Sequence, residues 1–175
     1  MAEFFHASKM AYKVGDIISI QNYENGVNFD HANRSEEDQT INDLLDELRP
    51  TEEYPSRSKC IYLFDNIYSC TNYAKQDELN IYKVYVDNVV GPFPFYLVGA
   101  FQKYPSFRKQ IASEYWNHTL DWKVNEYICT QMKVVEKLKL SNCNSPVGVN
   151  RLVSDIDTFK GWLNRFQSGN AGQNS

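Results

Sequence analysis

The sequence has no uninterrupted apolar run of the roughly 18 residues that a membrane-spanning helix requires. Its first residues, M-A-E-F-F-H-A-S-K, lack the basic region followed by an apolar region that marks a secretory signal, so we expect a cytoplasmic protein. The cysteines form no C-x-x-C pair and have no histidine at zinc-ligand spacing; they are Cys60, Cys70, Cys129 and Cys143. We therefore expect reduced thiols and no metal site, although the sequence leaves a structural disulfide open.

The local motifs of several large enzyme classes are also missing. The sequence contains no G-x-x-x-x-G-K, no G-x-G-x-x-G, no G-x-S-x-G and no H-E-x-x-H. The net charge is −4, from 18 basic and 22 acidic residues, which argues against broad electrostatic binding of nucleic acid but leaves a local basic patch possible.

Aromatic residues are abundant, at 14% of the chain, and 12 of them are tyrosines. Such side chains suit surfaces that stack on planar groups or bind them by hydrogen bonds. A chain of 175 residues is long enough for one domain with a real core. We expect a single domain over residues 1–167, followed by a disordered tail over residues 168–175, S-G-N-A-G-Q-N-S.

The hydrophobic pattern predicts short groups of strands separated by helices, which favours the α+β class. Strands are expected at Glu3–Ser8, Ile17–Ile20, Ile61–Phe64, Leu79–Val90, Val124–Thr130 and Met132–Leu140. Helices are expected after Ser35 and before Pro50, from Ile67 to Ala74, after Ser106 to Trp116, and from Leu152 to Phe166. Loops are expected at Asn22–Arg34 and Gly91–Tyr104.

The segment from Lys59 to Ala74 is the centre of the predicted fold. A buried strand runs directly into a helix there, with Asp65 or Asn66 as the helix cap and Tyr62 near the junction. His6 is the one histidine in an apolar strand context, F-F-H-A-S. Taken alone, each of these two side chains is more often a satisfied core residue than a functional one.

Four motifs, in order, resemble one enzyme family. F-F-H-A-S followed by K-V-G-D-I-I resembles the first strand of ADP-ribosyltransferases of the H-Y-E class, particularly the rifampicin-modifying branch. I-Y-L-F-D, with Ser69, Asn72 and Tyr73 downstream, is similar to the I-Y-F-A-D and S-A-N-Y segment of poly-ADP-ribose polymerases. I-Y-K-V-Y-V-D-N-V-V-G-P resembles their central strand, and N-E-Y-I-C-T-Q-M-K-V-V-E-K-L resembles the closing hairpin that carries the catalytic acid.

The resemblance covers about Phe4 to Leu138, and it extends to an uncharacterised bacterial family with P-S-R before the tyrosine strand and E-Y-W before the last hairpin. It implies an α+β fold of the split β-sandwich type, with two small sheets and flanking helices around an NAD cleft. The implied activity is mono-ADP-ribosylation, with NAD as co-substrate. Small bacterial and phage relatives commonly modify a host protein, so the implied acceptor is a protein, with a nucleic acid as a further possibility.

Residue roles follow from the same resemblance, and the chemistry agrees with them. Expelling nicotinamide leaves a ribosyl cation, so a site needs an aromatic platform, donors for the carboxamide and a carboxylate for the cation. The implied catalytic residues are Glu126, His6 and Tyr62. The implied NAD-binding residues are His6 (ribose), Ala7 and Ser8 (carboxamide), Tyr54, Tyr62 and Tyr73 (rings), and Arg57 (pyrophosphate).

Several alternatives stay open at this point. Ala7 replaces the glycine that usually follows the histidine, and Glu114 and Glu136 compete with Glu126 for the acid role. Arg57 is equally well explained as an exposed loop charge. The alternative functions are NAD hydrolysis, a partner-binding module of the same fold without turnover, and, more weakly, a relative of tRNA 2′-phosphotransferases.

Overall fold

The computed structural model describes residues 2–20, 27–28, 36–76, 79–139 and 146–170. The strands are β1 (Ala2–Ser8), β2 (Ile17–Ser19), β3 (Val27–Asn28), β4 (Ile61–Phe64), β5 (Asn80–Val86), β6 (Val90–Pro94), β7 (Asn125–Cys129) and β8 (Gln131–Leu138). The α-helices are α1 (Glu36–Glu47), α2 (Ile67–Gln76), α3 (Tyr96–Lys103), α4 (Arg108–Asn117) and α5 (Pro146–Asn170). Two 3₁₀ turns, η2 (Arg57–Lys59) and η3 (Pro105–Phe107), precede β4 and α4.

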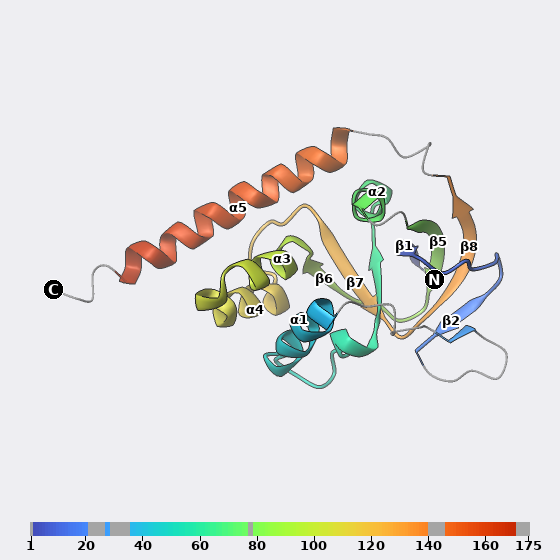
Figure 1. The fold of residues 1–175 in the computed structure, drawn as a ribbon, viewed down its shortest axis with the longest axis horizontal. Coiled ribbons are helices and arrows are strands. Elements are labelled where there is room, and N and C mark those ends of the chain that lie inside the picture. The colour runs from blue at the N-terminus through green and yellow to red at the C-terminus, as the bar shows by residue number, and fades with distance from the viewer. Residues whose placement is uncertain (1, 21–26, 29–35, 77–78, 140–145, 171–175) are drawn as a thin grey trace.

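The strands form one eight-stranded sheet in the order β3-β2-β8-β5-β1-β4-β7-β6. All neighbouring pairs are antiparallel except β2 and β3. The α+β class is therefore confirmed. β7 ends at Cys129 and β8 begins at Gln131, yet β4, β1 and β5 lie between them in the sheet, so the sheet must curl back on itself (Figure 1).

The sheet is weakly joined in the middle. β1 and β5 are paired over seven residues, whereas β1 and β4 share a single registered pair, Phe5 with Phe64. We call the β1–β4 junction the seam. The expectation of two separate small sheets is wrong, because backbone pairing crosses the seam, and the seam divides the sheet into a five-strand part and a three-strand part.

Three hydrophobic clusters cover the two faces of this sheet. The strand cluster, inside the curl, is built from β-strand side chains and Tyr12; its largest members include Phe4, Ile18, Leu63, Tyr82 and Met132. The helix cluster packs α1, α3, α4 and α5 against β4, β6 and β7 through residues such as Leu45, Phe93, Phe101, Tyr115 and Phe159. A smaller cluster packs α2 on β1, β4 and β5.

The predicted strand Leu79–Val90 and loop Gly91–Tyr104 need correction. The exposed residues Asp87 and Asn88 interrupt the strand, and the chain returns as β6 and continues into α3. β6 is the last strand in the sheet, where Pro92 and Pro94 are tolerated because an edge strand does not need every N–H. The prolines therefore misled the prediction of an irregular segment.

The predicted closing hairpin is also wrong. β7 pairs with β4 and β6, whereas β8 pairs with β5 and β2, so the two consecutive strands are not partners. Ser106 does not cap α4, because the N-cap position is Phe107 and no side chain binds it. The turn η3 begins one residue earlier, at Pro105.

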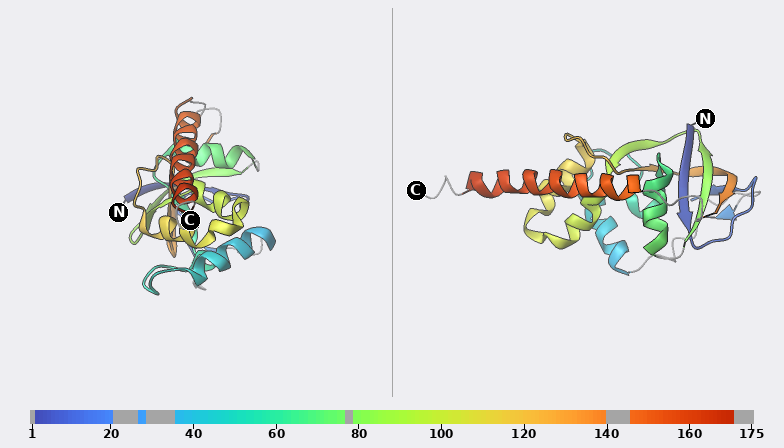
Figure 2. Two further views of the ribbon diagram at one scale, coloured as in Figure 1. Left: turned by 90° about the vertical axis from the view of Figure 1, so that its left-hand side faces the viewer. Right: turned by 90° about the horizontal axis from the view of Figure 1, so that it is seen from above.

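The ends of the predicted elements are otherwise close to those observed. Asn66 caps α2 by accepting a bond from the Tyr68 N–H at 2.9 Å. α5 is longer than predicted and continues through residues 168–170 of the expected tail; residues 171–175 lie outside the described part (Figure 2). Of the predicted loop at 22–34, only β3 is described, and Ser35 and Cys143 also lie outside the described residues. No helix in the described ranges has the length and apolar character needed to cross a membrane.

Candidate functional site

A buried polar site lies around Arg57, whose side chain is 3% exposed. Its guanidinium carbon lies 4.8 Å from the ring centroid of Tyr62 and 4.8 Å from that of Tyr115. The same group forms an ion pair with Glu126, donates to the Tyr115 hydroxyl, and donates from Nε to Oδ1 of Asn42 at 3.1 Å. A planar cation is therefore held between two aromatic rings and against one carboxylate. We call Arg57, Tyr62, Tyr115 and Glu126 the guanidinium box.

The Glu126 side chain is buried, at 3% exposure, and has two partners in the box. Besides the Arg57 ion pair, its Oε1 accepts a hydrogen bond of 2.8 Å from the Tyr115 hydroxyl. Burial alone would lower the pKa of Arg57, but the Glu126 carboxylate and the neighbouring Tyr115, Tyr62 and Cys60 side chains together outweigh it and hold that pKa well above its ordinary value. Burial raises the pKa of Tyr115 well above its ordinary value, so its hydroxyl stays protonated and able to donate.

The sheet register brings Tyr62 and Glu126 to one face. Tyr62 is opposite Ile128, and Phe64 is opposite Glu126, on the adjacent strands β4 and β7. Side chains at alternate strand positions share a face, so the Tyr62 ring and the Glu126 carboxylate both point toward the helix cluster. The predicted pairing of these two residues around one group is thus physically possible in this fold.

Helix α1 fixes the turn that carries Arg57. The Asp46 carboxylate accepts four bonds from this turn: from Ser56 Oγ at 2.5 Å, from the Arg57 N–H at 2.7 Å, and from Ser58 N–H and Oγ at 3.1 and 2.8 Å. Partial burial would raise the pKa of Asp46, but these bonds outweigh it and lower that pKa. The Tyr62 hydroxyl adds a bond of 2.5 Å to the Arg57 carbonyl. Backbone and side chain of Arg57 are therefore held independently.

His6 lies in the seam, on the other side of the sheet from the guanidinium box. It is directly opposite Tyr82 of the strand cluster, and its ring stacks on Tyr12 at 6.1 Å. Its Nδ1 donates to the Tyr62 carbonyl at 2.8 Å. Burial lowers the pKa of His6 to about 4, although that hydrogen bond raises it in part, so the ring is neutral at pH 7. His6 thus reaches the backbone of Tyr62, while its side chain does not converge with those of Tyr62 and Glu126.

The remaining predicted NAD-binding residues are spread around the seam and the helix cluster. Ala7 packs beside α2, and the Ser8 hydroxyl accepts from the Met10 N–H at 3.1 Å, which shapes the turn after β1. Tyr54 stacks on Trp116 with centroids 5.8 Å apart. Tyr73 of α2 contacts Phe64 of β4, with ring centroids 5.9 Å apart. The box joins three predicted residues directly, namely Tyr62, Arg57 and Glu126.

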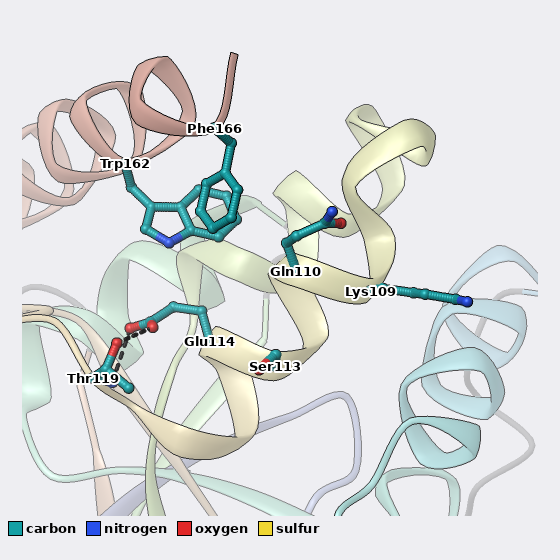
Figure 3. A pocket seen from close by; sticks show the side chains of 7 residues that line it. All are labelled: Lys109, Gln110, Ser113, Glu114, Thr119, Trp162 and Phe166. Carbon is teal, nitrogen blue, oxygen red and sulfur yellow. Dashed lines mark hydrogen bonds between the residues drawn. The ribbon is translucent and has the colours of Figure 1, made fainter. Parts of the chain in front are cut away.

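The competing glutamates have quite different surroundings. Glu136 is exposed on β8. Glu114 is buried on α4 beside a cavity of about 450 Å³ that Trp162 and Phe166 of α5 also line. Figure 3 shows its carboxylate turned toward Thr119. It accepts bonds from the N–H groups of Thr119 and Leu120 at 3.0 and 2.9 Å, from Trp122 Nε1 at 2.8 Å, and from the Thr119 hydroxyl.

A second cavity, of about 460 Å³, lies at the start of β6 and the end of β7. Its lining includes Pro55, two residues before Arg57, and Val90 and Ile128, which pair with each other next to Tyr62. Open space therefore adjoins β7, the strand that pairs with β4, and the segment just before the turn that carries Arg57.

Sequence reasoning missed three members of this site. Tyr115 lies in the helix predicted after Ser106, and a tyrosine rather than a phenylalanine there is itself a signal, because a buried hydroxyl needs a partner. Asn42 interrupts the apolar stripe of α1 beside Ile41, which is a similar signal. Asp46 had none. Arg57 as an exposed loop charge is wrong, since its side chain is buried.

No protein-family model matches this chain, and a search of curated proteins gives no significant match.

Proposed function

We propose that this protein is an NAD-dependent mono-ADP-ribosyltransferase that transfers ADP-ribose to a macromolecular acceptor, and that this acceptor is a protein. The observation that carries the proposal is the guanidinium box, in which the Tyr62 ring and the Glu126 carboxylate together hold a planar cation. The group to be recognised has the same character, because the nicotinamide end of NAD is a flat ring with a positive charge. A site that stabilises one such group is chemically suited to the other.

The chemistry assigns each side chain a task. In the reaction the bond between the ribose carbon and the nicotinamide nitrogen breaks, its electron pair leaves with nicotinamide, and an acceptor nucleophile bonds to the ribose carbon and loses a proton. Glu126 would stabilise the positive charge that develops on the ribose, an effect that is stronger in a buried site than in water. Tyr62 would stack on the leaving ring, and the Tyr115 hydroxyl would orient the carboxylate.

His6 takes a positioning role in this proposal. Its bond to the Tyr62 carbonyl joins β1 to β4 at the seam, where β1 and β4 have one registered pair. The predicted contact of His6 with a ribose hydroxyl stays a prediction, and so does the predicted contact of Arg57 with the pyrophosphate. Both would require side chains to move from the positions described above.

A second candidate is a partner-binding module without turnover. It is favoured by the ion pair that neutralises Glu126 and by the position of His6 on the opposite face. The two candidates make different predictions for Glu126→Gln. An enzyme loses nearly all nicotinamide release but still binds NAD, whereas a binding module keeps its partner affinity.

The test is to incubate the purified protein with radiolabelled NAD and a cell lysate, and to measure nicotinamide release and label on macromolecules. We expect labelled acceptor with wild type and a loss of about a hundredfold or more in Glu126→Gln. The control is Glu136→Gln, the same change on the exposed side of β8, which should retain activity. Free ADP-ribose without labelled acceptor would indicate NAD hydrolysis instead. No nicotinamide release from any preparation would contradict the proposal.

A further inference from the structure

Arg57 occupies the place that the proposed function assigns to a ligand. Its guanidinium lies over the Tyr62 ring at 4.8 Å and contacts the Glu126 carboxylate. A dinucleotide cannot use that ring and that carboxylate while the guanidinium remains between them. The chain therefore supplies its own planar cation to the site.

The buried charges are not needed for packing alone. Apolar residues of similar volume often replace a buried ion pair without loss of stability, because desolvation offsets much of the attraction. Here both charged residues are at 2% exposure beside the apolar and aromatic side chains of the helix cluster, with Asn42 as a buried polar neighbour. A buried arginine beside Glu126 suits an exchange of partners, in which the cation of a ligand replaces the Arg57 guanidinium at the carboxylate.

The turn carrying Arg57 is attached mainly to α1. Asp46 binds three consecutive residues of this turn, and Asn42 binds the guanidinium itself. α1 in turn packs through Leu45, whose carbonyl accepts from Trp116 Nε1 at 3.0 Å. The cavity of about 460 Å³ begins at Pro55, just before the turn. Releasing the Asp46 bonds would let the turn move toward that space.

We propose that Arg57 is an internal competitor for the Glu126 site, and that Asp46 holds it there. The inference rests on the proposed function for the identity of the natural ligand, and it deepens that function by adding a closed state. The ligand class is a planar organic cation that stacks on Tyr62 and pairs with Glu126. Binding requires Arg57 to leave, so the apparent affinity is reduced by the fraction of molecules in which it is displaced.

The experiment measures the affinity of 1-methylnicotinamide and of NAD by calorimetry for wild type, Asp46→Ala and Glu47→Ala. Glu47 is the exposed neighbour of Asp46 on α1, so it controls for loss of one negative charge. Asp46→Ala should bind both probes about tenfold more tightly or better, since it removes bonds to a charged acceptor. Glu47→Ala should match wild type.

A second variant, Arg57→Lys, keeps the positive charge but loses the planar group that fits between two rings. It too should bind the probes more tightly, whereas a purely structural Arg57 would lose stability with no gain in affinity. If folded Asp46→Ala and Arg57→Lys both bind as wild type does, or do not bind at all, the internal-competitor inference is wrong. If they bind 1-methylnicotinamide more tightly but no preparation cleaves NAD, the inference stands and the proposed function fails.

Discussion

Two buried glutamates of this protein are held in opposite ways. Glu114 accepts from two backbone N–H groups, an indole N–H and a hydroxyl, all from its own helix end and the loop that follows. Glu126, on β7, instead faces a cationic side chain 69 residues away in the sequence and the hydroxyl of Tyr115 on α4. Backbone donors cannot leave without unfolding the loop, whereas a side chain can rotate away. The comparison indicates a structural role for Glu114 and an exchangeable partner for Glu126.

The largest effect should come from breaking the charged pair. Arg57→Met leaves Glu126 buried without its counter-charge, which should lower the free energy of unfolding by about 3–5 kcal/mol. Urea denaturation at pH 7 measures it. Adding Glu126→Gln to Arg57→Met should recover a large part of the loss, because the isolated buried charge is gone. A loss below about 1 kcal/mol in the single variant would show that the carboxylate is not dependent on Arg57.

A pH series sharpens the comparison, because it separates the contribution of His6 to the pH dependence of stability from those of the two carboxylates. The pKa of His6 is about 4 in the folded state, against 6.5 for the free side chain, so the unfolded state binds more protons between these values. Stability is therefore complete above pH 6.5 and falls as the pH drops toward 4, by up to about 3 kcal/mol. Urea midpoints of wild type and His6→Gln at pH 7 and 4.5 measure this. An equal pH dependence in both proteins would contradict the assignment.

The backbone at Gly91, which lies against Glu126, is also more constrained than the backbone at Gly99 in α3. Gly91 has φ of +141°, and a Cβ there would lie 2.8 Å from Cδ1 of Tyr127 and 3.1 Å from the Glu126 carbonyl oxygen. Gly91→Ala should therefore cost about 1–3 kcal/mol and reduce any activity that depends on Glu126. Gly99→Ala is the matched control, because nothing lies within 4 Å of a Cβ added at this position of α3. This substitution should stabilise the protein by about 0.5–1 kcal/mol. Thermal unfolding of the two variants would distinguish the loss of stability expected for Gly91→Ala from the gain expected for Gly99→Ala.

Much of the local structure could be predicted from the sequence, because hydrophobic period and cap chemistry are local signals. β4, the Asn66 cap and α2 follow directly from the segment around Tyr62. Strand pairing is not local, and this is where prediction failed. β7 and β8 are separated by one residue, and only the curl of the sheet explains why they have different partners.

The candidate site shows the same division. The choice of Tyr62 and Glu126 came from sequence motifs, and the register supports their common face. Arg57 could not be recognised as the partner of Glu126 in this way, because the local sequence Pro55-Ser56-Arg57 does not differ between an exposed and a buried arginine. Asp46 and Asn42, which hold the buried arginine, lie 11 and 15 residues before it on another element, α1.

A small loss is expected for Glu114→Gln, and it completes the comparison of the two glutamates. The amide oxygen can still accept the three bonds that Oε1 receives from Thr119 N–H, Leu120 N–H and Trp122 Nε1, and the Thr119 hydroxyl can rotate to accept from the new amide. We therefore expect a loss of only about 1–2 kcal/mol, from weaker bonds to a neutral acceptor. Nicotinamide release, measured beside Glu126→Gln, should stay within about twofold of wild type, since no bond of Glu114 reaches the guanidinium box. If Glu114→Gln folds normally and loses that activity while Glu126→Gln keeps it, the two carboxylates have been assigned the wrong way round.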